Sequence, residues 1–116
     1  MAAWAIFAGL AGVIHIAFFV LESFLFTKPA GRKIFATTEA DAETMKFFAF
    51  NQGFYNLFLA IGTFAGIALG HRVLVIFTCA SMVGAAAVLA TGGKKLIRGV
   101  IMQGAPPLIA LVLMHV

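Results

Sequence analysis

The sequence predicts an all-α integral membrane protein in which four spanning helices pack as one bundle. Of its 116 residues, 63% are hydrophobic and 10% are charged, whereas a soluble domain carries about a quarter charged residues. The mean hydropathy is +1.08. Such a chain has too few polar side chains to cover a water-facing surface, so its partner is the lipid bilayer. We expect a single transmembrane domain over residues 1–116.

Four apolar stretches are long enough to cross a bilayer, which takes about 20 mostly apolar residues. The expected helices cover residues 4–26, 39–69, 73–90 and 96–116. The segments between them contain Gly, Pro and Lys, which are typical of turns. Thr38, followed by Glu39 and Asp41, has the pattern of a helix N-cap with acids in the first turn. The second helix is therefore expected to begin near Glu39, outside the bilayer.

The basic residues are distributed unequally between the loops. Seven flank the loops after the first and third helices: Lys28, Arg32, Lys33, Lys46, Lys94, Lys95 and Arg98. The loop between the second and third helices has only Arg72. Because cytoplasmic loops carry the excess of Lys and Arg, both termini are expected on the non-cytoplasmic side of the membrane, periplasmic or extracellular. The net charge of +4 is small and comes from these short loops, so it indicates an orientation signal and not nucleic-acid binding.

Polar side chains recur inside the apolar stretches. Helix positions at ~1.5 Å per residue place Glu22, Asn51, Gln52 and Gln103 at similar depths near the cytoplasmic side, with His15 and Asn56 deeper. The spacing of Asn51, Gln52, Tyr55 and Asn56 is that of one helix face. Lipid cannot hydrogen-bond these groups, so they should face the bundle interior. We expect Glu22 to contact at least one of Asn51, Gln52 or Gln103, directly or through one water, and His15 to approach Asn56 or Tyr55.

These residues are the candidate functional site. Glu22 and His15 are the candidate catalytic acid and base, because an intramembrane carboxyl group is costly unless it has a function. The candidate ligand-binding residues are Asn51, Gln52, Tyr55, Asn56 and Gln103. A metal site is not expected, since His15 and Glu22 lie ~10 Å apart along one helix. No motif identifies a cofactor, and the amides could also serve only to hold the helices together.

Glycines recur every fourth residue in the outer half of the second helix, at Gly62, Gly66 and Gly70. Small residues at this spacing let two helices approach closely. The stripe predicts either packing within the bundle or a homodimer interface. Pro106 and Pro107 interrupt the hydrogen bonding of the last helix, which predicts a kink or a packing adjustment there.

Three segments resemble one family of small bacterial membrane proteins. They are HIAFFVLESF (15–24), FNQGFYNLFLA (50–60) and QGAPPLIALVL (103–113), and they resemble domain-of-unknown-function family 1304 over essentially the whole chain. The resemblance implies a compact four-helix inner-membrane protein and implies no agreed activity. The positions that match its pattern are His15, Glu22, Asn51, Gln52, Tyr55, Asn56, Gln103 and Pro106.

Three functions are compatible with these residues. The first is a polar pocket on the cytoplasmic side of the bundle that binds, and in one version chemically transforms, a small and largely apolar molecule. The second is a proton-coupled small-molecule transporter that works as a dimer. The third is a structural membrane subunit with a polar core. The sequence alone does not decide whether the protein is an enzyme.

Overall fold

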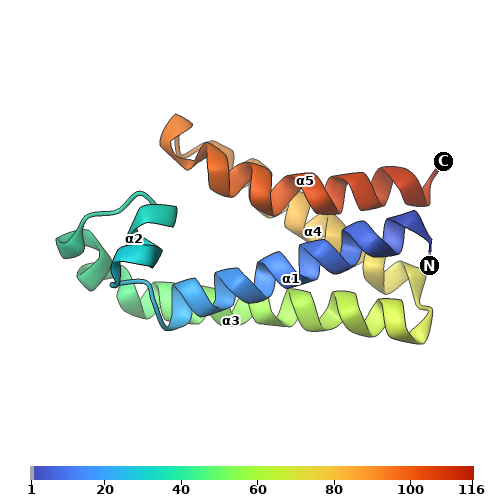
Figure 1. The fold of residues 1–116 in the computed structure, drawn as a ribbon, viewed down its shortest axis with the longest axis horizontal. Coiled ribbons are helices and arrows are strands. Elements are labelled where there is room, and N and C mark those ends of the chain that lie inside the picture. The colour runs from blue at the N-terminus through green and yellow to red at the C-terminus, as the bar shows by residue number, and fades with distance from the viewer. Residues whose placement is uncertain (1) are drawn as a thin grey trace.

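The computed structural model describes residues 2–116 and is entirely helical in its regular structure. Its elements are α1 (Ala3–Ser23), α2 (Pro29–Ile34), α3 (Glu39–Leu69), α4 (Arg72–Ala90), a short 3₁₀ helix η1 (Lys94–Leu96) and α5 (Ile97–Met114). Four long helices run side by side, with both chain termini at one end and α2 at the other (Figure 1). The predicted all-α class is confirmed.

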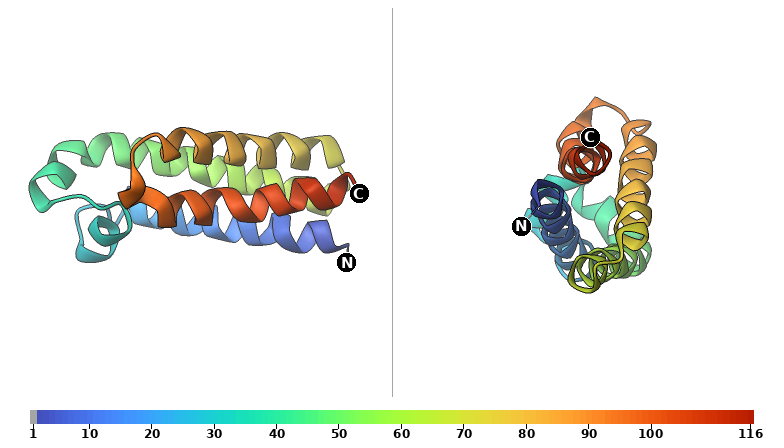
Figure 2. Two further views of the ribbon diagram at one scale, coloured as in Figure 1. Left: turned by 90° about the horizontal axis from the view of Figure 1, so that it is seen from above. Right: turned by 90° about the vertical axis from the view of Figure 1, so that its right-hand side faces the viewer.

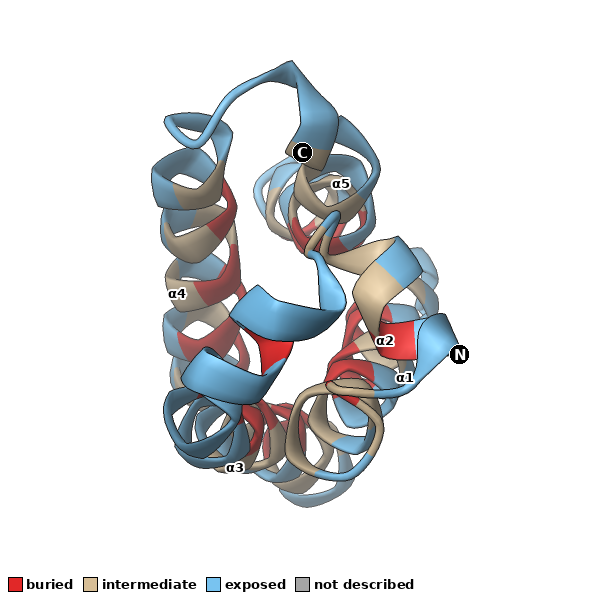
Figure 3. Cartoon of the chain, turned by 90° about the vertical axis from the view of Figure 1, so that its left-hand side faces the viewer, coloured by how far each residue is buried: buried red, intermediate tan, exposed pale blue. Residues whose placement is uncertain are grey.

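The four long helices form a ring in which each contacts two neighbours. Helix α1 packs against α3 and α5, and α4 closes the ring by packing against the same two helices (Figure 2). The buried residues lie on the inward faces of these helices (Figure 3). Alanines provide much of this interior, with Ala8, Ala11 and Ala60 fully buried, so the helix backbones approach one another closely.

The outward faces of the bundle are apolar. Large side chains such as Phe58, Val73 and Phe77 are more than half exposed, which is what a lipid-facing surface requires. Four helices, residues 3–23, 39–69, 72–90 and 94–114, are long and apolar enough to cross a membrane. The chain is therefore a multi-pass membrane protein, as the sequence predicts.

The second spanning helix begins where its cap predicts. The Thr38 side chain accepts a hydrogen bond from the Asp41 backbone N–H at 3.1 Å, and α3 starts at Glu39. It ends at Gly70, whose φ of 70° is the left-handed conformation common at helix ends. Helix α5 continues through Pro106 and Pro107, both of which are buried in the bundle.

The first loop differs from its sequence prediction. Helix α1 ends at Ser23 rather than near Phe26, because Phe26 folds back into a small cluster with Ala42 and Ala49 of α3. The short helix α2 was not predicted; it begins with a proline at its first position, where the missing N–H costs nothing. This loop therefore packs against α3 instead of extending into water.

Close contacts at two glycines set how α1 lies against α3. A Cβ on Gly12 would come within 2.7 Å of the Phe64 ring, and a Cβ on Gly53 would come within 2.1 Å of Ser23 Oγ and 3.0 Å of the Phe19 carbonyl oxygen. At Gly12 the Phe64 ring would have to shift, whereas at Gly53 the added atom would crowd both a side chain and a backbone oxygen, so Gly53 is the more restrictive of the two positions.

At the opposite end of the bundle, Arg72 of α4 contacts both α1 and α5. Its Nη2 donates to the Met114 carbonyl oxygen at 2.8 Å, and its guanidinium lies 5.3 Å from the centre of the Trp4 ring. One side chain of α4 thus contacts the first turn of α1 and the last turn of α5.

Gly53→Ala should destabilise the protein by about 1–3 kcal/mol, because the added methyl group meets Ser23 and a backbone oxygen. The matched control is Gly84→Ala on α4, where a Cβ would meet nothing within 4 Å and stability should stay unchanged or rise slightly. Reversible unfolding in mixed detergent micelles measures both. Equal stabilities of the two variants would show that the register of α1 and α3 does not depend on Gly53.

Candidate functional site

The carboxyl group of Glu22 pairs with an amide across the α1–α3 interface. Asn56 Nδ2 donates a hydrogen bond to Glu22 Oε1. Asn56 lies on the buried stripe of α3, with 4% of its surface exposed, whereas Glu22 in the last turn of α1 is only partly buried. The pair therefore joins a buried amide to a carboxyl group at the edge of the bundle.

The residues next to this pair explain why Glu22 meets Asn56. Gly53 brings Ser23 against α3, and Ser23 Oγ donates to the Phe50 carbonyl oxygen at 2.9 Å. Since α1 and α3 run in opposite directions, the residue before Ser23 lies opposite a residue one helical turn beyond Gly53. That residue is Asn56, so the backbone contact at Gly53 determines the partner of Glu22.

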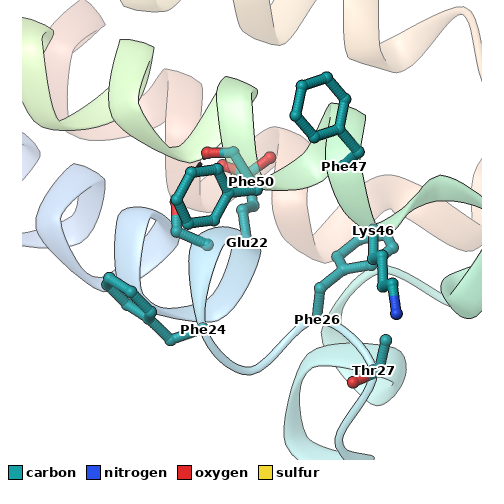
Figure 4. A pocket seen from close by; sticks show the side chains of 8 residues that line it. Glu22, Phe24, Phe26, Thr27, Lys46, Phe47 and Phe50 are labelled. Atoms are coloured by element: carbon teal, nitrogen blue, oxygen red, sulfur yellow. Dashed lines mark hydrogen bonds between the residues drawn. The ribbon is translucent and has the colours of Figure 1, made fainter.

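A pocket of about 290 Å³ opens beside Glu22. Its lining comes from the end of α1, the following loop and the first half of α3: Glu22, Ser23, Phe24, Phe26, Thr27, Lys46, Phe47 and Phe50. Figure 4 shows phenylalanine rings on both sides of the Glu22 side chain and the Lys46 ammonium directed toward Thr27. The pocket is thus an aromatic recess with one acid on its wall and one base at its rim.

The charge at the rim is already partly compensated. Lys46 Nζ pairs with the Glu43 carboxylate one turn earlier on α3, and both side chains are largely exposed. Glu22 has no basic partner within residues 2–116, and Asn56 bonds only one of its two oxygens. The second oxygen, Oε2, forms no hydrogen bond within residues 2–116.

His15 lies outside this pocket. It is fully buried in the bundle, its Nδ1 lies 2.8 Å from the Ala11 carbonyl oxygen, and its ring packs edge-on against Phe18 at 5.5 Å. No hydrogen bond links it to Asn56 or Tyr55 within residues 2–116. The predicted approach of His15 to those residues therefore stays a prediction.

The other predicted site residues are dispersed. Asn51, Gln52 and Tyr55 are exposed on α3, and Tyr55 lines a separate apolar groove between α3 and α4. Gln103 is buried on α5 but forms no hydrogen bond with Glu22 in the described chain. The hydrogen-bond partner of Glu22 in the described chain is Asn56, and the predicted contact with Asn51, Gln52 or Gln103, directly or through one water, stays a prediction.

Residue counts along a helix predict depth in the membrane but not the direction in which a side chain faces. Asn51 and Gln52 share α3 with Asn56 but are exposed, whereas Asn56 is buried. The aromatic lining of the pocket was missed for a related reason, because Phe24 and Phe26 belong to a turn that only the folded loop defines. The sequence signal that could have identified the Glu22–Asn56 pair was a small residue, Ser23, next to Glu22 on α1, together with Gly53 next to the amides on α3.

The glycine stripe of α3 packs against α4 of the same chain. A Cβ on Gly66 would come within 2.7 Å of Val75, and one on Gly62 within 3.0 Å of Thr78, both on α4. Gly70 is the helix end described above. The predicted homodimer interface gains no support from these contacts and stays a prediction.

The described residues hold no group of three His, Cys, Asp or Glu side chains that could bind a metal ion. Cys79 is a free thiol buried in the core. The polar chemistry of the site is therefore that of one carboxyl group, one amide, two hydroxyl groups and one ammonium group.

Fold and site together define a small four-helix membrane protein with a carboxyl group at the edge of its bundle. A family model described as "Protein of unknown function (DUF1304)" matches residues 9–115. The chain belongs to this family. No curated protein and no solved structure matches the chain.

Glu22→Ala should lower the free energy of unfolding by about 1–3 kcal/mol, because the buried Asn56 amide then loses its acceptor. Glu22→Gln should cost clearly less, since its carbonyl oxygen can accept the same hydrogen bond. Detergent unfolding of both variants, with Glu43→Ala as an exposed control, measures the difference. Equal losses for Glu22→Ala and Glu22→Gln would contradict the importance of the bond to Asn56.

Proposed function

We propose that the pocket beside Glu22 binds a small, largely apolar molecule that carries a hydrogen-bond donor. The observation that supports this most directly is the combination of phenylalanine walls with one carboxyl group whose second oxygen has no protein partner in residues 2–116. Ligand sites are commonly apolar recesses with a few polar groups that fix orientation. Here Glu22 Oε2 would accept from a hydroxyl or amino group, and the rings would contact the apolar body.

The size of the pocket limits the ligand. A volume of about 290 Å³ is at the small end of the range of ligand sites. The rims of the pocket, formed by Phe24 and Phe47, are more than half exposed, so the recess is open toward the lipid-facing surface. These features favour a compact molecule that dissolves in the membrane over a large polar metabolite.

Binding is proposed here rather than catalysis by a Glu22–His15 pair. His15 does not line the pocket, and the two residues lie two helical turns apart on α1, ~10 Å along its axis. An acid and a base must reach the same reacting group to act together. The transporter and structural-subunit hypotheses remain predictions from the sequence.

The pocket is proposed to face the cytoplasm. The loops that carry seven of the eight basic residues lie at the α2 end of the bundle (Figure 1), and the pocket lies near this end. The positive-inside rule then places α2 in the cytoplasm and both termini on the opposite side.

A photoreactive probe tests the pocket. The probe is 4-[3-(trifluoromethyl)diazirin-3-yl]benzyl alcohol, an aromatic molecule with one hydroxyl group, added to the protein in lipid nanodiscs. Labelling should concentrate on Phe24, Phe47 and Phe50 and should be competed by excess benzyl alcohol. Mass spectrometry of peptides locates the adducts.

Two variants make this test specific. Glu22→Gln should weaken labelling severalfold, because a neutral amide is a poorer acceptor than a carboxylate. Phe77→Ala removes an exposed ring of α4 that does not line the pocket and should leave labelling of Phe24, Phe47 and Phe50 unchanged. Uncompeted labelling spread over lipid-facing rings such as Phe58 and Phe77 would refute a defined pocket.

Cysteine labelling tests the orientation. In a Cys79→Ala background, Ala2→Cys should react with a membrane-impermeant maleimide in intact cells, and Lys94→Cys should react only after lysis. The reverse pattern would place the pocket on the non-cytoplasmic side and leave the proposal of ligand binding itself untouched.

A further inference from the structure

An apolar groove lies between α3 and α4 on the outer surface of the bundle. Its volume is about 390 Å³, and its walls include Tyr55 and Phe58 of α3 and Leu74 and Phe77 of α4. Gly62 also lines the groove and adds no side chain to fill it. Phe58 and Phe77 are more than half exposed. Because α3 and α4 are both long and apolar enough to span the membrane, the groove opens onto lipid.

The groove is open because α4 lies beside α3 at only one end of the bundle. The start of α4 packs on the end of α3, where the hydroxyl oxygens of Thr63 and Thr78 are 2.8 Å apart. The end of α4 packs on α5 instead, where a Cβ on Gly104 would lie 2.8 Å from the Cβ of Ala86. Figures 1 and 2 show α4 passing from beside α3 to beside α5. The α2 half of α3 therefore has one side that α4 does not cover.

Three polar side chains lie on this uncovered side of α3. Tyr55 lines the groove, and Asn51 and Gln52 precede it by four and three residues, which is the spacing of one helix face. All three are exposed, and none forms a side-chain hydrogen bond within residues 2–116. The amides lie level with the end of α1, since Ser23 bonds to the Phe50 carbonyl oxygen. The groove is thus apolar along its length and polar at its α2 end.

A glycerophospholipid has the same order of groups. Its acyl chains fill the hydrocarbon core, and its ester carbonyl oxygens lie at the boundary of that core. Tyr55 and Gly62 are seven residues apart, ~10 Å along α3, which fits within one leaflet of a core ~30 Å thick. Side-chain amides and a phenolic hydroxyl group can donate hydrogen bonds, whereas ester carbonyl oxygens only accept. None of the residues that line the groove is charged, so these neutral donors are the groups available for recognition.

We propose that the groove between α3 and α4 binds one phospholipid from the leaflet at the α2 end. An acyl chain lies along Phe58 and Gly62, and the amides of Asn51 and Gln52 donate to the ester carbonyl oxygens. The lipid supplies acceptors to donors that would otherwise face hydrocarbon without partners, which is unfavourable. No residue lines both this groove and the pocket beside Glu22, so the two sites are separate.

Native mass spectrometry of the full chain tests the lipid. The protein is released from micelles that contain equal amounts of two phosphatidylcholines with chains of equal length, one ester-linked and one ether-linked. The ether-linked lipid lacks both carbonyl oxygens. The wild-type monomer should retain one lipid and should retain the ester-linked form severalfold more often. Retention of no lipid, equal retention of the two forms, or release as a lipid-free dimer would overturn the proposal.

Two double variants test the amides. Asn51→Leu with Gln52→Leu removes both donors from exposed positions and should abolish the preference for the ester-linked lipid. Asn51→Gln with Gln52→Asn exchanges the two amides and should keep the preference. An undiminished preference in the leucine variant would contradict hydrogen bonding by these side chains.

Two tryptophan variants test the place of the acyl chain. Leu74→Trp enlarges a wall of the groove and should lower retention of both lipids severalfold. Val112→Trp adds the same ring to an exposed position of α5 outside the groove and should leave retention unchanged. Equal retention by these two variants would show that the acyl chain does not lie between α3 and α4.

Discussion

The contact between Gly53 and the end of α1 determines most of what is distinctive in this bundle. Because Gly53 has no side chain, Ser23 can hydrogen-bond the α3 backbone at Phe50. This contact fixes the register of two antiparallel helices, and a register fixes every pair along them. Asn56 meets Glu22, and Phe50 becomes a wall of the pocket. The absence of a side chain at Gly53 thus determines which residues of α1 and α3 lie next to each other.

The polar contacts of the interior are concentrated on α3. The amide of Asn56 binds α1, and the hydroxyl group of Thr63 binds Thr78 of α4. Helix α5 is held differently, by alanine and proline packing and by the bond from Arg72 to Met114 at its end. In a bilayer, where burial of apolar surface drives helix association little, such hydrogen bonds and close packing are the available forces. The interior hydrogen bonds between side chains therefore join α1, α3 and α4, and packing joins α5 to α1 and α4.

The sequence predicted the helices well and the site only in part. Hydropathy and the Thr38 cap are local signals, so four spanning helices and the start of α3 could be recognised without a structure. The pairing of Glu22 could not, because it depends on Ser23 fitting against Gly53, a contact between residues thirty positions apart in the chain. Asn51 and Gln52 share a helix with Asn56, but small differences in angle around the axis leave them exposed. Phe26 lines the pocket because the loop folds back, and the hydrophobic periodicity of the sequence does not predict how a loop folds.

Helix α3 has 31 residues, whereas α1 has 21 and α4 has 19. At ~1.5 Å per residue the shorter helices match a hydrocarbon core of ~30 Å, and α3 exceeds it by several turns. The surplus lies at the α2 end, since α3 ends beside the start of α1 at the other (Figure 1). The surplus residues 39–46 carry four charged side chains, so they extend beyond the hydrocarbon, and Phe47 and Phe50 lie where the apolar part of α3 begins. Bilayer thickness becomes a variable that governs how deeply the mouth of the pocket is immersed, and lipids of different chain length should tune access to Glu22.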